Sequence, residues 1–130
     1  MSDFALNKEL SVTYEEALAA LPAALSTEGF GVLTQIDVDA VLKQKLDVPF
    51  RRYKILGACN PKLAHRALTA DLVAGVMLPC NVVVWESDEG RARVAAVDPR
   101  QTAAARANPA IAELAEEVGT RLSRVLERLV

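Results

Sequence analysis

The sequence is poor in the residues that usually carry catalysis or hold a cofactor. Its 130 residues include one histidine, two cysteines and one tryptophan, and aromatic residues make up only 5% of the chain. No apolar run approaches the ~20 residues that a bilayer span needs, and the first residues lack the basic start and apolar core of a signal peptide. We therefore expect a cytoplasmic protein without a membrane partner, in which both cysteines are free thiols.

Several motifs with a known mechanism are also absent. The chain has no Gly-x-Ser-x-Gly turn of a serine hydrolase and no glycine-rich phosphate loop. It has neither a Cys-x-x-Cys nor a His-x-x-x-His pair, so we predict no metal and no cofactor. The low aromatic content and the net charge of −2 argue against a nucleic-acid partner.

Basic residues are present but unevenly distributed. Between residues 43 and 66, seven bases stand against one acid, Asp47, which gives a local charge of +6 and leaves −8 for the rest of the chain. These bases are Lys43, Lys45, Arg51, Arg52, Lys54, Lys62 and Arg66. A local positive field on an acidic protein suits a small anionic molecule better than a long polyanion. The alternative is a helix and a strand edge whose charges are simply solvated.

The length and the apolar pattern predict a single α+β domain over residues 1–130. Alternating apolar residues predict strands near 3–11, 30–37, 52–58, 78–86 and 91–97. Two long helices are expected at 13–28 and at about 109–129, with short helices after Asp37 or Asp39 and over about 61–70. The expected architecture has two layers, with the long helices on one face of a mostly antiparallel five-stranded sheet.

Local signals predict where several helices begin. Thr13 and Glu16 form a capping box, in which each side chain bonds a backbone amide at the start of the first helix. Asn60 followed by Pro61 is an N-cap followed by a first-turn proline. The same Asn-Pro pair at 108–109 predicts the start of the last helix.

The segment 76–86 is apolar on both faces of the strand it predicts. Leu78, Val82 and Val84 alternate with Val83 and Trp85, which is typical of a strand covered on both sides. Two long helices cannot cover both faces of a five-stranded sheet. We therefore predict a homodimer, in which a partner covers the second face.

Motifs spread over nearly the whole chain resemble a known family. They are Gly31-Val32-Leu33-Thr34 to Asp37-Val38, YKILGACNP at 53–61, AHRAL at 64–68 and LPCNVVV at 78–84. With these motifs the chain resembles the domain of unknown function 302 family of small bacterial and archaeal domains. Gly57 to Pro61 together with Leu78 to Asn81 is the most specific part. The resemblance implies a two-layer β-α-β(4)-α fold, often dimeric, and no established activity.

Both cysteines lie beside residues that fix the backbone, in Cys59-Asn60-Pro61 and Pro79-Cys80-Asn81. If the third and fourth strands are neighbours, both thiols can lie at one end of the sheet. A helix N-terminus and nearby bases such as Lys54 and His65 stabilise a thiolate. Alternatively, both are small core residues, as free cysteines often are. With His65 they also supply three soft ligands, short of the four that a structural zinc site uses.

Two hypotheses of function remain open. One is a homodimeric, non-enzymatic binding module that holds a small anionic or amphipathic ligand near Lys54, Cys59, Asn60, His65, Cys80 and Asn81. The other is a thiol-dependent redox or sulfur-transfer protein, with Cys59 or Cys80 as the catalytic nucleophile and His65 as a candidate base. The binding module is favoured because a catalytic thiol usually needs a base placed to activate it. The only histidine lies six residues beyond Cys59 and on a different element from Cys80.

Overall fold

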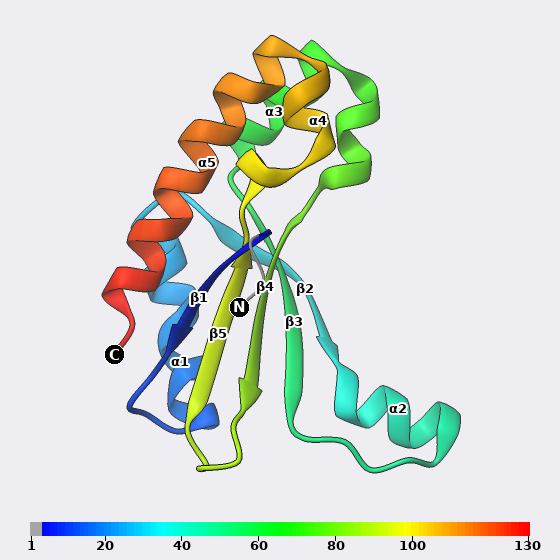
Figure 1. Cartoon of the computed structure of the whole chain (residues 1–130), viewed down its shortest axis with the longest axis vertical. Coiled ribbons are helices and arrows are strands. Elements are labelled where there is room, and N and C mark those ends of the chain that lie inside the picture. The colour runs from blue at the N-terminus through cyan, green and yellow to red at the C-terminus, as the bar shows by residue number, and fades with distance from the viewer. Residues whose placement is uncertain (1–3) are drawn as a thin grey trace.

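Five strands and a set of helices form a two-layer structure. The computed structural model describes residues 4–130, except for the side chains at positions 103 and 104. The strands are β1 Ala5–Glu9, β2 Gly31–Asp37, β3 Tyr53–Cys59, β4 Cys80–Glu86 and β5 Ala92–Val97. The helices are α1 Tyr14–Ser26, α2 Val38–Leu46, α3 Pro61–Ala70, α4 Ala103–Ala107 and α5 Pro109–Arg128, and the 3-10 helices are η1 Leu72–Met77 and η2 Pro99–Gln101. All neighbouring strands are antiparallel, in the order β1-β5-β4-β3-β2 (Figure 1), which confirms the predicted α+β fold.

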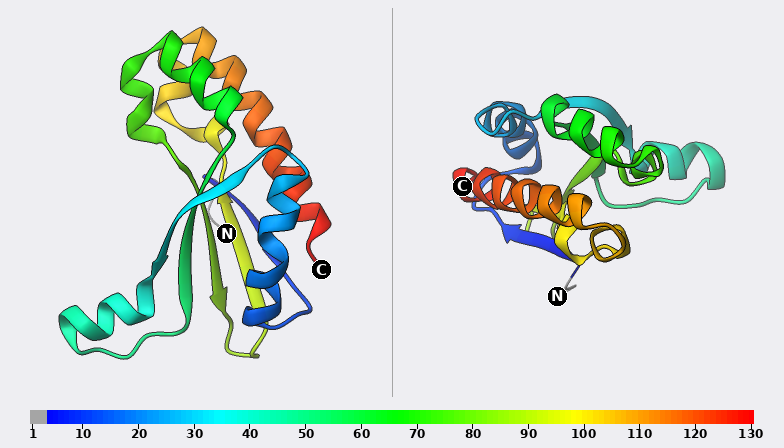
Figure 2. Two further views of the ribbon diagram at one scale, coloured as in Figure 1. Left: turned by 180° about the vertical axis from the view of Figure 1, so that it is seen from behind. Right: turned by 90° about the horizontal axis from the view of Figure 1, so that it is seen from above.

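The helices α1 and α5 pack beside each other on one face of the sheet (Figure 2). The core between helices and sheet contains Leu21 and Leu25 of α1, Leu122 of α5, and Val82 and Val84 of β4, all of them fully buried. Successive strand residues point to opposite faces, so this core takes every second residue of β4. The two predicted long helices therefore lie on one face, as expected.

The predicted capping signals are present. Thr13 and Glu16 form the capping box of α1: the Glu16 N–H donates to Thr13 Oγ1 at 3.2 Å, and the Thr13 N–H donates to Glu16 Oε1 at 3.0 Å. Asn60 caps α3, and Asn108 caps α5. Pro22 lies inside α1, which continues through it to Ser26.

The strand β1 is held against the end of α5 as well as against β5. Lys8 Nζ donates to the Leu126 carbonyl at 3.0 Å and to the Leu129 carbonyl at 2.5 Å. The Ser11 N–H donates to the Val130 carbonyl at 2.7 Å. A lysine at a helix C-terminus also balances the partial negative charge there. The contact between Lys8 and Leu126 joins residues 118 positions apart.

Three segments differ from the sequence-based expectation. The strand predicted from Val76 begins only at Cys80, because 72–77 forms the 3-10 helix η1 and a cis Leu78–Pro79 bond follows it. The segment between Val97 and Pro109, for which no element was predicted, forms η2 and α4. The first predicted strand started at residue 3, which lies outside the described residues, and β1 starts at Ala5.

No helix of residues 4–130 lies across the second face of the sheet, which we call the outer face (Figure 1). It carries Ile36, Ile55 and Val83, together with Tyr53 and Trp85, whose rings stack with centroids 5.8 Å apart. Ile36 is 48% exposed, and the other four are half-buried. The part of the outer face formed by β2, β3 and β4 is therefore largely apolar and open, whereas the part formed by β1 and β5 carries the Arg93–Glu9 ion pair.

Beyond one end of the sheet, the helices α3, η1 and α4 gather around the first half of α5 (Figures 1 and 2). The strand ends that meet there are the C-terminal ends of β3 and β5 and the N-terminal end of β4. Within residues 4–130, no helix is long and apolar enough to cross a membrane.

Candidate functional site

A cavity of about 370 Å³ lies at this end of the sheet. One wall is built from Phe30, Ala58, Cys59, Asn60, Leu63, Ala64, Ala67, Asp71, Val73, Ala74, Val76, Met77, Leu78 and Cys80. The other is built from Val97, Pro99, Thr102, Ala107, Asn108, Ile111, Leu114, Ala115 and Val118. We call it the end cavity. Its volume is within the range of about 300–1,000 Å³ that small-molecule sites occupy.

Asn60 fixes the wall of the end cavity that α3 provides. Its Oδ1 accepts from the Leu63 N–H at 3.3 Å, which caps α3, and Pro61 supplies the first helical position. Its Nδ2 donates to the Glu28 carbonyl at 3.2 Å. One side chain therefore joins the start of α3 to the end of α1.

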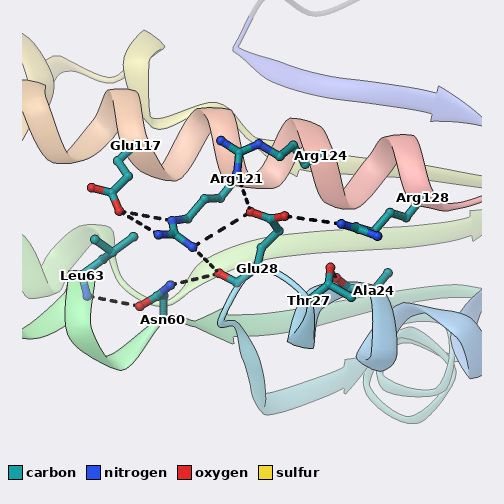
Figure 3. A network of polar contacts seen from close by, with 9 residues as sticks. All are labelled: Ala24, Thr27, Glu28, Asn60, Leu63, Glu117, Arg121, Arg124 and Arg128. Atoms are coloured by element: carbon teal, nitrogen blue, oxygen red, sulfur yellow. Dashed lines mark hydrogen bonds and ion pairs between the residues drawn. The ribbon is translucent and has the colours of Figure 1, made fainter.

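Glu28 lies at the centre of an ionic network behind this wall (Figure 3). Its side chain is only 6% exposed and meets three arginines of α5: Arg124 at 3.0 Å, Arg128 at 3.9 Å and Arg121 at 4.0 Å. Arg121 also donates to the Glu28 carbonyl at 3.1 Å and pairs with Glu117. Glu117 and Arg121 are one helical turn apart, and their pair is part of this half-buried network.

Both cysteines line the end cavity and are free thiols. The register of β3 and β4 pairs Ala58 with Cys80, so Cys59 is one residue beyond the direct partner of Cys80. Burial, and secondarily the neighbouring Cys59, raises the pKa of the Cys80 thiol from 9.0 to about 11. Cys80 is therefore a neutral thiol near pH 7.

The other predicted site residues lie outside the end cavity. Lys54 is on β3 and pairs with Asp37 at 3.1 Å. Asn81 is exposed on β4. His65 lines a separate shallow depression on the other side of α3, together with Arg66 and Glu113. The structure thus brings together Cys59, Asn60 and Cys80 but not Lys54, His65 and Asn81.

The basic segment 43–66 is engaged elsewhere. Five of its seven bases pair with carboxylates: Lys43 with Asp47, Arg51 with Asp88, Arg52 with Glu15 and Glu86, Lys54 with Asp37, and Arg66 with Glu117. None of the seven lines the end cavity. Apart from the two thiols, Asp71 is the one ionisable residue of its described lining. No group of three or more histidine, cysteine or acidic side chains within the described residues is placed to hold a metal.

Comparison with known proteins places this architecture in a family. The family model described as "Domain of unknown function DUF302" matches residues 6–129. The chain belongs to the DUF302 family. The crystal structure of an uncharacterized conserved DUF302 protein from Bacillus stearothermophilus is similar to it, with a TM-score of 0.90 and 32% sequence identity over 99% of this chain and 100% of that one. A search of the curated proteins found no match.

Sequence reasoning missed Asp71 and the wall that α5 gives to the end cavity of this DUF302 domain. The C-terminal half of α5 joins the core under the sheet through Leu122, Val125 and Leu126, whereas Ile111 and Leu114 of its N-terminal half line the cavity. The difference in length between the last helix and the strands indicates that part of the helix lies beyond the sheet. A helix of 20 residues spans ~30 Å, whereas strands of 7 residues span ~23 Å. The helix therefore has to extend past the sheet.

Proposed function

We propose that this DUF302 domain is a homodimeric, non-enzymatic binding module that holds a small apolar or amphipathic molecule in the end cavity. The observation that carries the proposal is the end cavity itself. It is large enough for a ligand, its lining is mostly aliphatic, and its few polar residues lie at the two ends of α3 and just before α4 and α5. Small-molecule sites commonly combine a mainly apolar wall with a few placed polar groups.

The charge distribution favours an apolar body over the small anion expected from the sequence. Five of the seven bases that suggested an anion pair with carboxylates outside the cavity, none of the seven lines it, and the lining itself includes the acidic residue Asp71. A free anion in such a site would lose its hydration and gain no cation. An apolar molecule would instead bury its surface against Leu63, Ile111 and Leu114.

Thiol chemistry remains the second candidate, because Cys59 and Cys80 line the same cavity. Two observations count against it. The raised pKa of Cys80 leaves little thiolate at neutral pH, and the thiolate is the nucleophile. His65, the candidate base, faces a different depression.

The second part of the proposal is that another copy of the chain covers the outer face. Phe50, Tyr53 and Trp85 form a row of aromatic rings, with centroids 6.3 Å and 5.8 Å apart, from the loop after α2 onto the outer face. None of the residues of α2 is buried, and Leu46 at its end is 66% exposed. Contiguous apolar surface of this kind marks interaction sites in stable proteins.

Binding is tested with a neutral fluorescent probe, N-phenyl-1-naphthylamine. Ala67→Phe adds a ring to the cavity wall, and Ala23→Phe adds the same ring at an exposed position of α1. We expect fluorescence enhancement with the wild type and with Ala23→Phe, and at least about tenfold weaker binding with Ala67→Phe, because the added ring occupies the cavity. Circular dichroism checks that both variants fold. Absent probe binding by the wild type, or equal binding by Ala67→Phe, would contradict the proposal.

A further inference from the structure

Asp71, the residue between α3 and η1, is the acidic residue of the end-cavity lining. Its N–H donates to the Ala67 carbonyl at 2.9 Å, and its Oδ1 accepts from the Val73 N–H at 2.9 Å. Within residues 4–130, the second oxygen, Oδ2, has no hydrogen-bond partner. Asp71 is half-buried and is one of the residues that line the cavity. A carboxylate with one uncommitted oxygen therefore stands at this site.

The remaining polar side chains of the lining already bond the backbone. Asn60 uses its Oδ1 and its Nδ2 for the Leu63 amide and the Glu28 carbonyl. The Thr102 hydroxyl donates to the Pro99 carbonyl at 2.8 Å, and Asn108 Oδ1 accepts from the Ala110 N–H at 2.9 Å. All three are neutral. Asp71 is therefore the one acidic residue of the described lining, which contains no base.

The segment after Asp71 shows which end of a ligand this charge would meet. Val73, Val76 and Met77 of η1 line the cavity and are at the same time 70%, 81% and 45% exposed. Residues that are both lining and exposed form a rim, so Asp71 lies at the mouth of the cavity. Ala58 and Leu114 are buried and lie deeper. A bound molecule would place its polar end at the mouth and its apolar body inside.

The following inference rests on the proposed function. We propose that the ligand of the end cavity is an amphipathic amine, which has an apolar body and ends in a protonated amino group bound by the carboxylate of Asp71. A charge-assisted hydrogen bond from an ammonium to a carboxylate is stronger than one between neutral groups. A carboxylate ligand of the same shape would instead place its charge beside the like charge of Asp71. The end cavity would therefore select a cationic ligand, whereas the basic segment 43–66 predicted an anionic one.

Three probes with the same ten-carbon chain separate shape from charge: decylamine, decanol and decanoate. Calorimetric titration at pH 7, below the micellar concentration of each probe, gives their dissociation constants. We expect decylamine to bind at least about threefold more tightly than decanol, and decanoate to bind more weakly than both. Asp71→Asn keeps the oxygen that caps η1 and removes the charge, and Asp88→Asn removes an exposed charge of the β4–β5 turn.

Asp71→Asn should bind decanol as the wild type does and lose the preference for decylamine, whereas Asp88→Asn should retain it. Unchanged decanol binding also shows that the cavity of Asp71→Asn is intact. If all three probes bind the wild type equally, if decanoate binds best, or if Asp71→Asn keeps the preference, the amine inference is wrong and the proposed function stands. If none of the three binds, both are wrong.

Discussion

Gly57 of β3 stands where two neighbouring segments leave no room for a side chain. A Cβ at this position would lie 2.2 Å from Thr34 Oγ1 and 2.7 Å from Pro79 Cγ. Pro79 belongs to the segment that leads into β4, and the next residue, Cys80, lines the end cavity. The absence of a side chain at Gly57 thus fixes how closely the entry to β4 approaches β3.

We expect Gly57→Ala to lower the free energy of unfolding by about 1–3 kcal/mol, because overpacking displaces side chains and backbone. Gly31→Ala is the matched control. Gly31 lies on the neighbouring strand β2, and a Cβ at this position would meet nothing within 4 Å. Its effect should stay within about 0.5 kcal/mol. Urea denaturation followed by circular dichroism measures both. Equal stability of the two variants would show that the Pro79 segment moves away at no cost.

Cys80 gives a prediction on pH. Because the pKa of the Cys80 thiol is raised from 9.0 to about 11, the fraction of thiolate at pH 8 should be about a hundredfold lower than that of an unperturbed thiol. In Cys59→Ser, where Cys80 is the one thiol left, alkylation by iodoacetamide should be slow at pH 8 and accelerate as the pH rises towards 11. The same variant in urea, where the burial is lost, should react at the ordinary rate. Rapid labelling of the folded variant at pH 7 would revive the thiol-enzyme hypothesis.

Glu28 joins two helices: it follows α1 and pairs with arginines of α5. The Glu28 carboxylate is nearly enclosed, whereas its partners Arg124 and Arg128 are about half exposed. Removing one member of a buried ion pair costs ~3–5 kcal/mol, because the other charges lose their partner. Water reaches the arginines here and reduces that cost.

Glu28→Gln should therefore destabilise the protein by about 2 kcal/mol, which is below the range for a fully buried pair because the arginines are half exposed. Glu127→Gln, which changes an exposed carboxylate on α5, should alter the stability by less than about 0.5 kcal/mol. Thermal unfolding by calorimetry at low salt compares the two variants. A Glu28→Gln protein as stable as Glu127→Gln would show that the arginines separate without cost.

The elements that the sequence predicted well are those with local causes. The helix α3 was expected at 61–70 and is found there, because Asn60 and Pro61 specify its start within three residues. The segment 72–77 was different. Its run of Leu72, Val73 and Val76 is apolar without a period, and such a run does not distinguish a strand from a 3-10 turn. Only the fold shows that these residues stand on a rim.

The candidate site was predictable only in part. The sequence placed Cys59, Asn60 and Cys80 together because they mark the predicted end of one strand, the start of the next helix and the start of the next strand. The opposite wall comes from residues 97–118, and the position of that wall depends on where α5 leaves the sheet. The partners of Lys54 and Arg66 are likewise remote in sequence, so a count of charges could not show that they are already paired.

The whole molecule is expected to associate through the outer face. Ile36→Asp places a charge on this face at a residue that is already 48% exposed, so the monomer should still fold. We expect light scattering after size exclusion to give a dimer for the wild type and a monomer for Ile36→Asp. Leu72→Asp, which changes an 85% exposed residue at the other end of the molecule, should remain a dimer. A monomeric wild type at micromolar concentration would end the dimer proposal.

The pairing of β1 with β5 also has a consequence for the order in which the protein folds as it is made. Ala5 pairs with Val97, and Lys8 reaches the last turn of α5. The antiparallel run from β2 to β5 can assemble as each strand emerges from the ribosome, because its neighbours follow one another in the chain. The strand β1 has no edge to join until β5 has been synthesised, and closing so long a loop is slow. An early segment thus completes the sheet last, and its apolar side chains stay unprotected until β5 has emerged.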